Sequence, residues 1–139
     1  MAITNSDNNS KRQNYASGSK WEDIVGYSRA VKVWNIIEIA GTTSVDDQGH
    51  VVGENNAYDQ TIYILEKIEK YLKLAGSSMN HVVRTRMYVT DISLWEEIGK
   101  AHGAFFKSIK PAATMVEVSK LISPELLVEI EATAIIPEP

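Results

Sequence analysis

The chain contains no cysteine, which excludes disulfides, thiolate metal sites and a catalytic thiol. It also lacks an excess of positive charge. The formal net charge is -4, so nucleic acid is an unlikely main partner, because binding to phosphates requires a basic surface. No apolar run approaches the length of a membrane-spanning helix, and the Asn/Ser-rich N-terminus lacks the apolar core of a signal peptide. We therefore expect a cytoplasmic protein with no membrane partner.

What the sequence does contain is typical of one globular domain. Its 139 residues are 44% hydrophobic and 23% charged, and a chain of this length supports one core but not two. Residues 1–18 are predicted to be a flexible N-terminal tail, because their polar run over 5–10 cannot bury apolar surface. Residues 19–139 then form the single domain.

The pattern of apolar residues predicts an α+β fold. One helix is expected from an N-cap at Asn56 to a terminating Gly76, and a second begins near Ser93. Strands are expected over residues 27–33, 34–39, 83–89, 111–118 and 126–132, with a turn at 46–49. Because the strand pairs are adjacent in sequence, two helices should cover one face of a mixed sheet.

Alternation along the strands predicts that the other sheet face, which we call the outer face, is polar. It should combine charges of both signs with a tyrosine and a methionine: Arg84, Arg86, Tyr88, Ala113, Met115, Glu117, Glu129 and Glu131. This mixture is more typical of a surface that meets a partner than of a solvated face. Since homo-oligomers are the common case, we expect self-association through it.

The most informative motifs are the last two strands, PAATMVEV at 111–118 and LLVEIEA at 126–132. Earlier landmarks are VGY at 25–27, AGT at 40–42 and VRT at 83–85. In this order and spacing they resemble the RidA (YjgF-like) family over about residues 27–136. The resemblance implies the chorismate-mutase-like RidA fold and a homotrimer with small-molecule clefts between its subunits. It also implies the activity of the best-known members, deamination of 2-aminoacrylate and related imines without a cofactor.

The resemblance also assigns site residues by position. Tyr27 falls on the pocket tyrosine of the family, Gly41 on its glycine and Glu129 on its water-orienting glutamate. Thr42, Thr114 and Met115 are expected to line the same cleft, although Met115 replaces a cysteine and Gly99 an asparagine. Ala113 replaces the arginine that grips the substrate carboxylate through two charged hydrogen bonds, and an alanine offers none. The chain therefore resembles branches that lack this arginine, and 2-aminoacrylate activity should be weak or absent.

Two other arginines are candidates for the missing cation. Arg29 lies two residues after Tyr27, so both side chains should leave the same face of one strand. Arg86 is the second candidate. The alternative for either arginine is a salt bridge to one of three acids, Glu38, Glu117 or Glu131.

Glu129 and Tyr27 are the candidate catalytic residues, and each has a structural alternative. Glu129 either orients a hydrolytic water in a pocket that perturbs its pKa or pairs with Arg84 or Arg86, across the sheet or across a subunit boundary. Tyr27 either donates its hydroxyl to a ligand or is an interface tyrosine. No metal site is expected, because the three histidines, His50, His81 and His102, lack metal-ligand spacing.

Three functions are consistent with these observations. The first is a homotrimeric hydrolase of small imines, enamines or related C–N compounds, in which Glu129 positions water. The second is a non-catalytic trimer that binds a small metabolite in the same clefts. The third, an RNA-cleaving or translation-inhibiting protein as some relatives are labelled, is least supported, because the chain lacks an aromatic-basic strip.

Overall fold

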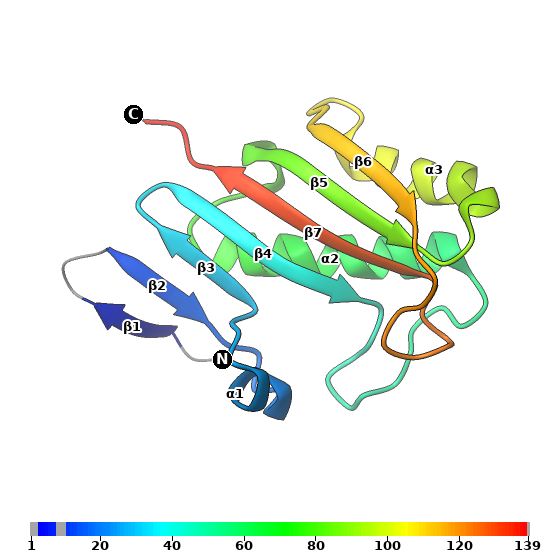
Figure 1. Ribbon diagram of the computed structural model, residues 1–139. Helices are drawn as coiled ribbons and strands as arrows, with labels where there is room; N and C mark the ends of the chain where they lie inside the picture. The colour runs from blue at the N-terminus through cyan, green and yellow to red at the C-terminus, as the bar shows by residue number, and fades with distance from the viewer. Residues whose placement is uncertain (1–2, 8–10, 139) are drawn as a thin grey trace.

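The computed structural model describes residues 3–7 and 11–138, and one seven-stranded sheet organises them (Figure 1). The strand order is β1-β2-β3-β4-β7-β5-β6, and only the β5–β6 pair is parallel. The strands are β1 (Ile3–Asp7), β2 (Arg12–Tyr15), β3 (Ala30–Val33), β4 (Ile36–Thr43), β5 (Val82–Val89), β6 (Ala112–Glu117) and β7 (Val128–Ile135). The helices are α1 (Lys20–Val25), α2 (Ala57–Leu74) and α3 (Trp95–Phe106), with 3-10 turns η1 (Met79–His81) and η2 (Ile92–Leu94). The predicted α+β class with a mixed sheet is confirmed.

Helices α2 and α3 cover one face of the sheet, and the core lies between the two layers (Figure 1). Strand β7 shows the alternation that this arrangement requires. Its four core residues, Val128, Ile130, Ala132 and Ala134, are buried, whereas the residues between them are partly exposed. Helix α2 contributes a buried apolar stripe of Ile64, Leu65, Ile68 and Leu72. The hydrophobic face of each element is therefore directed to one shared core.

Both predicted ends of α2 are confirmed. The Asn56 side chain accepts a hydrogen bond from the backbone N–H of Asp59 at 2.9 Å, which satisfies a free donor of the first turn. At the other end Gly76 has φ 83°, and the backbone N–H of Ser77 donates to the carbonyl of Leu72 at 2.8 Å. This is the left-handed C-terminal motif that favours glycine.

The expectation of a flexible tail over residues 1–18 is wrong for the part that the structure describes. Strand β2 pairs with β3, and Tyr15 is only 3% exposed. Ladder hydrogen bonds come from the backbone, so the polar sequence of β2 joins the sheet without the apolar run that predicts a strand. Residues 1–2 and 8–10 of this prediction lie outside the described residues.

The predicted orientation of β6 is also wrong. In the parallel ladder Arg86 is opposite Thr114, and Thr85 is opposite Ala113. Thr114 therefore shares the outer face with Arg86, whereas Ala113, Met115 and Glu117 belong to the face that the helices cover. The side-chain period of a strand is two, so a one-residue difference in register exchanges the faces. This register follows from the crossover through α3, which the pattern of β6 alone does not specify.

Candidate functional site

The site begins at a bulge in β4. Ile39 pairs with Ala132, and Thr42 pairs with Ile130, so β4 advances three residues where β7 advances two. The bulge brings Gly41 against β7. The carboxylate of Glu129 fills the space that a Cβ on Gly41 would occupy. A glycine at this position lets the acid lie directly against the backbone of β4.

Arg29 lies on the other side of the same glycine. Arg29 directly precedes β3, and its backbone extends the pairing of β3 with β4. The N–H of Ala40 donates to the carbonyl of Arg29 at 3.0 Å. Its Nη2 donates to the carbonyl oxygen of Gly41 at 2.6 Å. The guanidinium carbon is 5.9 Å from the centre of the Tyr27 ring, within the range of a cation–π contact. The structure thus brings together four of the sequence-predicted site residues: Tyr27, Arg29, Gly41 and Glu129.

The environment of Glu129 favours its protonated form. Burial raises the pKa of Glu129, the charge of Arg29 acts in the opposite direction, and the charge of Glu131 adds to the rise. Within residues 3–7 and 11–138, no salt bridge joins Glu129 to a cation. The alternative of pairing with Arg84 or Arg86 is therefore not seen. A half-buried carboxylate with a raised pKa is suited to accept a proton from a water molecule near neutral pH.

Arg86 is engaged elsewhere on the outer face. Its Nε lies 3.7 Å from a carboxylate oxygen of Glu131. The hydroxyl of Tyr88 donates to the same carboxylate at 2.9 Å. This contact is the main cause that raises the pKa of Tyr88. The salt-bridge alternative for Arg86 is thus the arrangement that the structure contains.

The remaining predicted site residues do not reach Glu129 within one chain. Thr42 is buried and donates its hydroxyl to the carbonyl of Ala40 at 2.8 Å. The Thr114 hydroxyl accepts a hydrogen bond from Arg84 at 2.9 Å, and Ala113 and Met115 lie on the helix-covered face. If these residues take part in the site, they must come from another copy of the chain.

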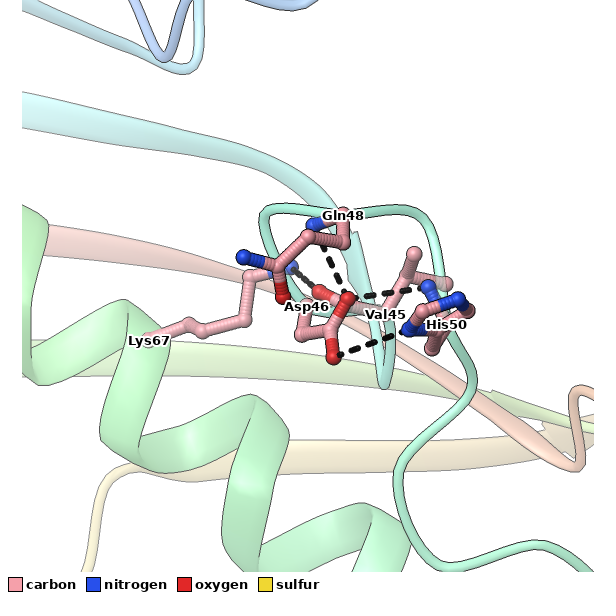
Figure 2. Close-up of polar contacts among 5 residues, drawn as sticks. All are labelled: Val45, Asp46, Gln48, His50 and Lys67. Atoms are coloured by element: carbon pink, nitrogen blue, oxygen red, sulfur yellow. Dashed lines mark hydrogen bonds and ion pairs between the residues drawn. The ribbon is translucent and has the colours of Figure 1, made fainter.

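Sequence reasoning missed the contribution of Lys67, on α2. Its Nζ donates to the carbonyl oxygen of Thr43 at 3.1 Å. It also donates to the carbonyl oxygen of Val45 at 2.9 Å, which ties the loop after β4 to the helix (Figure 2). Burial lowers the pKa of Lys67 to about 8, and the charge of Arg29 contributes to this shift. The sequence offers no signal for this role, since a lysine in a helix is usually solvated.

Asp46 shapes the tip of that loop. Its Oδ1 accepts hydrogen bonds from the backbone N–H groups of Gln48 and His50, both at 2.9 Å (Figure 2). Gly49 has φ 86° and donates its N–H to the Asp46 carbonyl at 3.0 Å, so the predicted turn is confirmed. Thr43, at the start of the loop, is the ladder partner of Glu129. The turn and Lys67 therefore fix the backbone on one side of the site.

An open cleft of 630 Å³ lies on the outer face beside this cluster. Tyr27 and Ala40 line it and connect it to the site, and Glu38, Arg86 and Glu131 form part of its charged wall. Arg29 and Glu129 are not among its lining residues, so in the single chain the carboxylate of Glu129 is not part of the cleft wall. In the described part of the chain, no three His, Asp or Glu side chains are grouped as metal ligands.

His102, on α3, makes a structural contact. Its Nε2 lies 2.9 Å from the hydroxyl of Thr85, and its ring is 4.6 Å from that of Phe106. Burial lowers the pKa of His102, which favours the neutral imidazole.

Comparison with known proteins decides the family. The model of the family described as Endoribonuclease L-PSP matches residues 17–136. The chain belongs to this family, the YjgF/RidA family. A crystal structure of a YjgF/YER057c/UK114 family member from Mycobacterium tuberculosis is 46% identical, with a TM-score of 0.81 over 90% of this chain and 99% of that one. The family resemblance and the fold drawn from the sequence are thereby confirmed.

Curated relatives are similar over most of their length. A RutC family protein of Pyrococcus horikoshii is 35% identical over 78% of this chain and 85% of its own. The 3-aminoacrylate deaminase RutC of Acinetobacter baylyi is 31% identical over 80% of this chain and 87% of its own. No helix among the described residues of this YjgF/RidA protein is long and apolar enough to cross a membrane.

Proposed function

We propose that this protein is a cofactor-free hydrolase that deaminates small imines or enamines, with Glu129 as the residue that positions and deprotonates water. The observation that carries the proposal is the half-buried carboxylate of Glu129, lodged against Gly41 with a raised pKa and no salt bridge among the described residues. Similarity to a 3-aminoacrylate deaminase supports the same reaction class. The active form would be a cytoplasmic homotrimer with the clefts between subunits.

The chemistry follows from the properties of this acid. An imine carbon is electrophilic, so attack of water on it forms a carbinolamine, and expulsion of ammonia leaves a carbonyl. The carboxylate of Glu129 accepts the proton of the attacking water and can return it to the leaving nitrogen. Tyr27 lies close enough to the cluster to donate its hydroxyl to the substrate. These steps need neither a metal nor an organic cofactor.

The test is ammonia release from a panel of neutral imines and imino acids. We expect Glu129-dependent release, lost by a hundredfold or more in Glu129→Gln, since a positioned base contributes about 10²–10⁴-fold. With Ala113 in place of the arginine, release from 2-aminoacrylate should be weak, because loss of a bidentate contact to a carboxylate costs ~2–5 kcal/mol, or about thirtyfold to several thousandfold. Turnover of 2-aminoacrylate equal to that of an arginine-bearing relative would contradict this.

Two other functions have distinct outcomes in the same experiments. A non-catalytic metabolite-binding trimer would bind members of the panel without releasing ammonia. The family description names an endoribonuclease, and an RNA-cleaving protein would retain and cleave RNA in a salt-sensitive manner. The net charge of -4 disfavours this last function.

A further inference from the structure

The guanidinium of Arg29 has no counter-ion in the part of the chain that the structure describes. Among residues 11–138, no carboxylate oxygen lies within 4.0 Å of it. Its contacts are to groups without formal charge, the carbonyl oxygen of Gly41 and the ring of Tyr27. Arg86, by contrast, has Glu131 beside it. Of the two candidate cations, Arg29 is thus the one that makes no salt bridge among the described residues.

One donor of Arg29 also lacks an acceptor. Its Nε is buried and makes no hydrogen bond to any described residue. A buried donor without an acceptor is unfavourable, and more so when it belongs to a charged group. This donor therefore requires an acceptor from outside the described chain. A guanidinium with no counter-ion favours an anion, and its planar fork matches the two oxygens of a carboxylate.

Gly41 places this cation beside the reactive acid. The carbonyl oxygen of Gly41 accepts a hydrogen bond from Nη2 of Arg29, and the carboxylate of Glu129 fills the space that a Cβ on Gly41 would occupy. The cation and the acid thus meet at one residue, yet no salt bridge joins them. An anion bound to Arg29 would therefore lie next to Glu129.

We infer that Arg29 is the carboxylate-binding residue of this protein and takes the role of the arginine that Ala113 replaces. The reaction rests on the function proposed above, whereas carboxylate binding rests on Arg29 alone. One N–H of Arg29 already donates to the carbonyl oxygen of Gly41. Arg29 should therefore bind a carboxylate more weakly than a guanidinium with all its donors free. We therefore expect activity on 2-aminoacrylate to be weak and not absent.

Binding of an inert pair of probes tests the inference without turnover. Propionate carries a carboxylate, and propionamide is its neutral counterpart of nearly the same shape. In NMR titrations of the full chain we expect propionate to bind at least tenfold more tightly than propionamide. The Arg29→Gln variant should lose at least tenfold in propionate affinity and no longer distinguish the two. Arg84→Gln, the same substitution at an arginine that donates to Thr114, is the matched control and should stay within twofold of the wild type.

Three results would overturn the inference. The first is equal affinity of the wild type for propionate and propionamide, as expected if water satisfies the donor. The second is failure of the wild type to bind propionate. The third is loss of propionate binding in Arg86→Gln but not in Arg29→Gln. If Arg29→Gln does not fold, Arg29→Lys replaces it. Lysine keeps the charge but has no planar group that could bond both Gly41 and a carboxylate. The Arg29→Lys variant should therefore bind propionate at least threefold more weakly than the wild type.

Ammonia release separates this inference from the proposed function. Glu129→Gln should still bind propionate while it loses turnover. If propionate binding depends on Arg29 but nothing in the panel releases ammonia, the proposed function fails and the assignment of Arg29 stands. If neutral imines are hydrolysed through Glu129 and propionate is not bound, the proposed function stands and the assignment of Arg29 fails.

Discussion

At the scale of single residues, the site depends on the absence of a side chain at Gly41. A Cβ at this position would coincide with the carboxylate of Glu129, which is the far end of a flexible side chain. The backbone of Gly41 has no positive φ, so it accepts any L-residue without strain. The absence of a side chain therefore serves the position of the acid and not the path of the chain. This allows the placement of Glu129 to be separated from the stability of the fold.

The Gly41→Ala variant should accordingly lose activity and keep its fold. The new methyl group displaces the carboxylate toward water, so the pKa of Glu129, measured by NMR, should fall toward its ordinary value. Ammonia release should drop at least about tenfold, since a base moved out of reach loses much of its contribution. The melting temperature should change little. Gly103→Ala, on α3 where a Cβ meets open space, is the matched control and should leave both the pKa and the rate unchanged.

At the scale of the elements, the spacing of apolar residues predicted those helices and strands whose positions are determined by burial of an apolar face. Helix α2 and strand β7 each bury one face of a regular pattern, so their positions and inward residues could be predicted. Strand β2 and the register of β6 could not, because ladder bonds and a crossover determine them. In the site, Tyr27 and Arg29 are in contact as their two-residue spacing predicts, but both precede β3 (Ala30–Val33), so the expectation that they share one strand is wrong. The contact of Gly41 with Glu129 depends on the bulge in β4. A glycine inside a strand indicates a bulge or a close approach, but it does not identify Glu129 as the group that approaches.

The link between α2 and the loop after β4 yields a prediction about stability. The pKa of Lys67 is about 8 in the folded protein and 10.5 as its ordinary value. Between these values the unfolded chain binds more protons at this residue than the folded chain, so its contribution to the free energy of unfolding rises with pH from about 8 to 10.5. Urea unfolding at pH 8, 9 and 10 should show this rise in the wild type. Lys67→Met should lack the rise, and parallel pH profiles of the two proteins would refute the assignment.

At the scale of the whole molecule, the sheet has two faces of different character. The helices cover one of them, and the outer face has polar contacts at its centre. Besides the Arg86–Glu131 pair, the hydroxyl of Thr133 donates to Glu38 at 2.6 Å. Apolar side chains border these contacts: Ile36 is 45% exposed and Ile135 is 40% exposed. A polar centre with exposed apolar neighbours is suited to contact another protein surface. Such a contact is also what would bring the predicted site residues that do not reach Glu129 within one chain to the site of a neighbouring copy.

We therefore expect a homotrimer that assembles through the outer face. Light scattering of the wild type at micromolar concentration should give three times the chain mass of 15.5 kDa. Thr133→Lys puts a long charged side chain at the centre of that face, where a packed interface cannot accommodate it but a solvated face can. This variant should dissociate and lose ammonia release, because its clefts would no longer form. Leu74→Lys, on α2 where the leucine is 44% exposed, introduces the same lysine on the helix layer and should remain trimeric. A monomeric wild type, or a Thr133→Lys protein that remains an active trimer, would show that the outer face is not the interface.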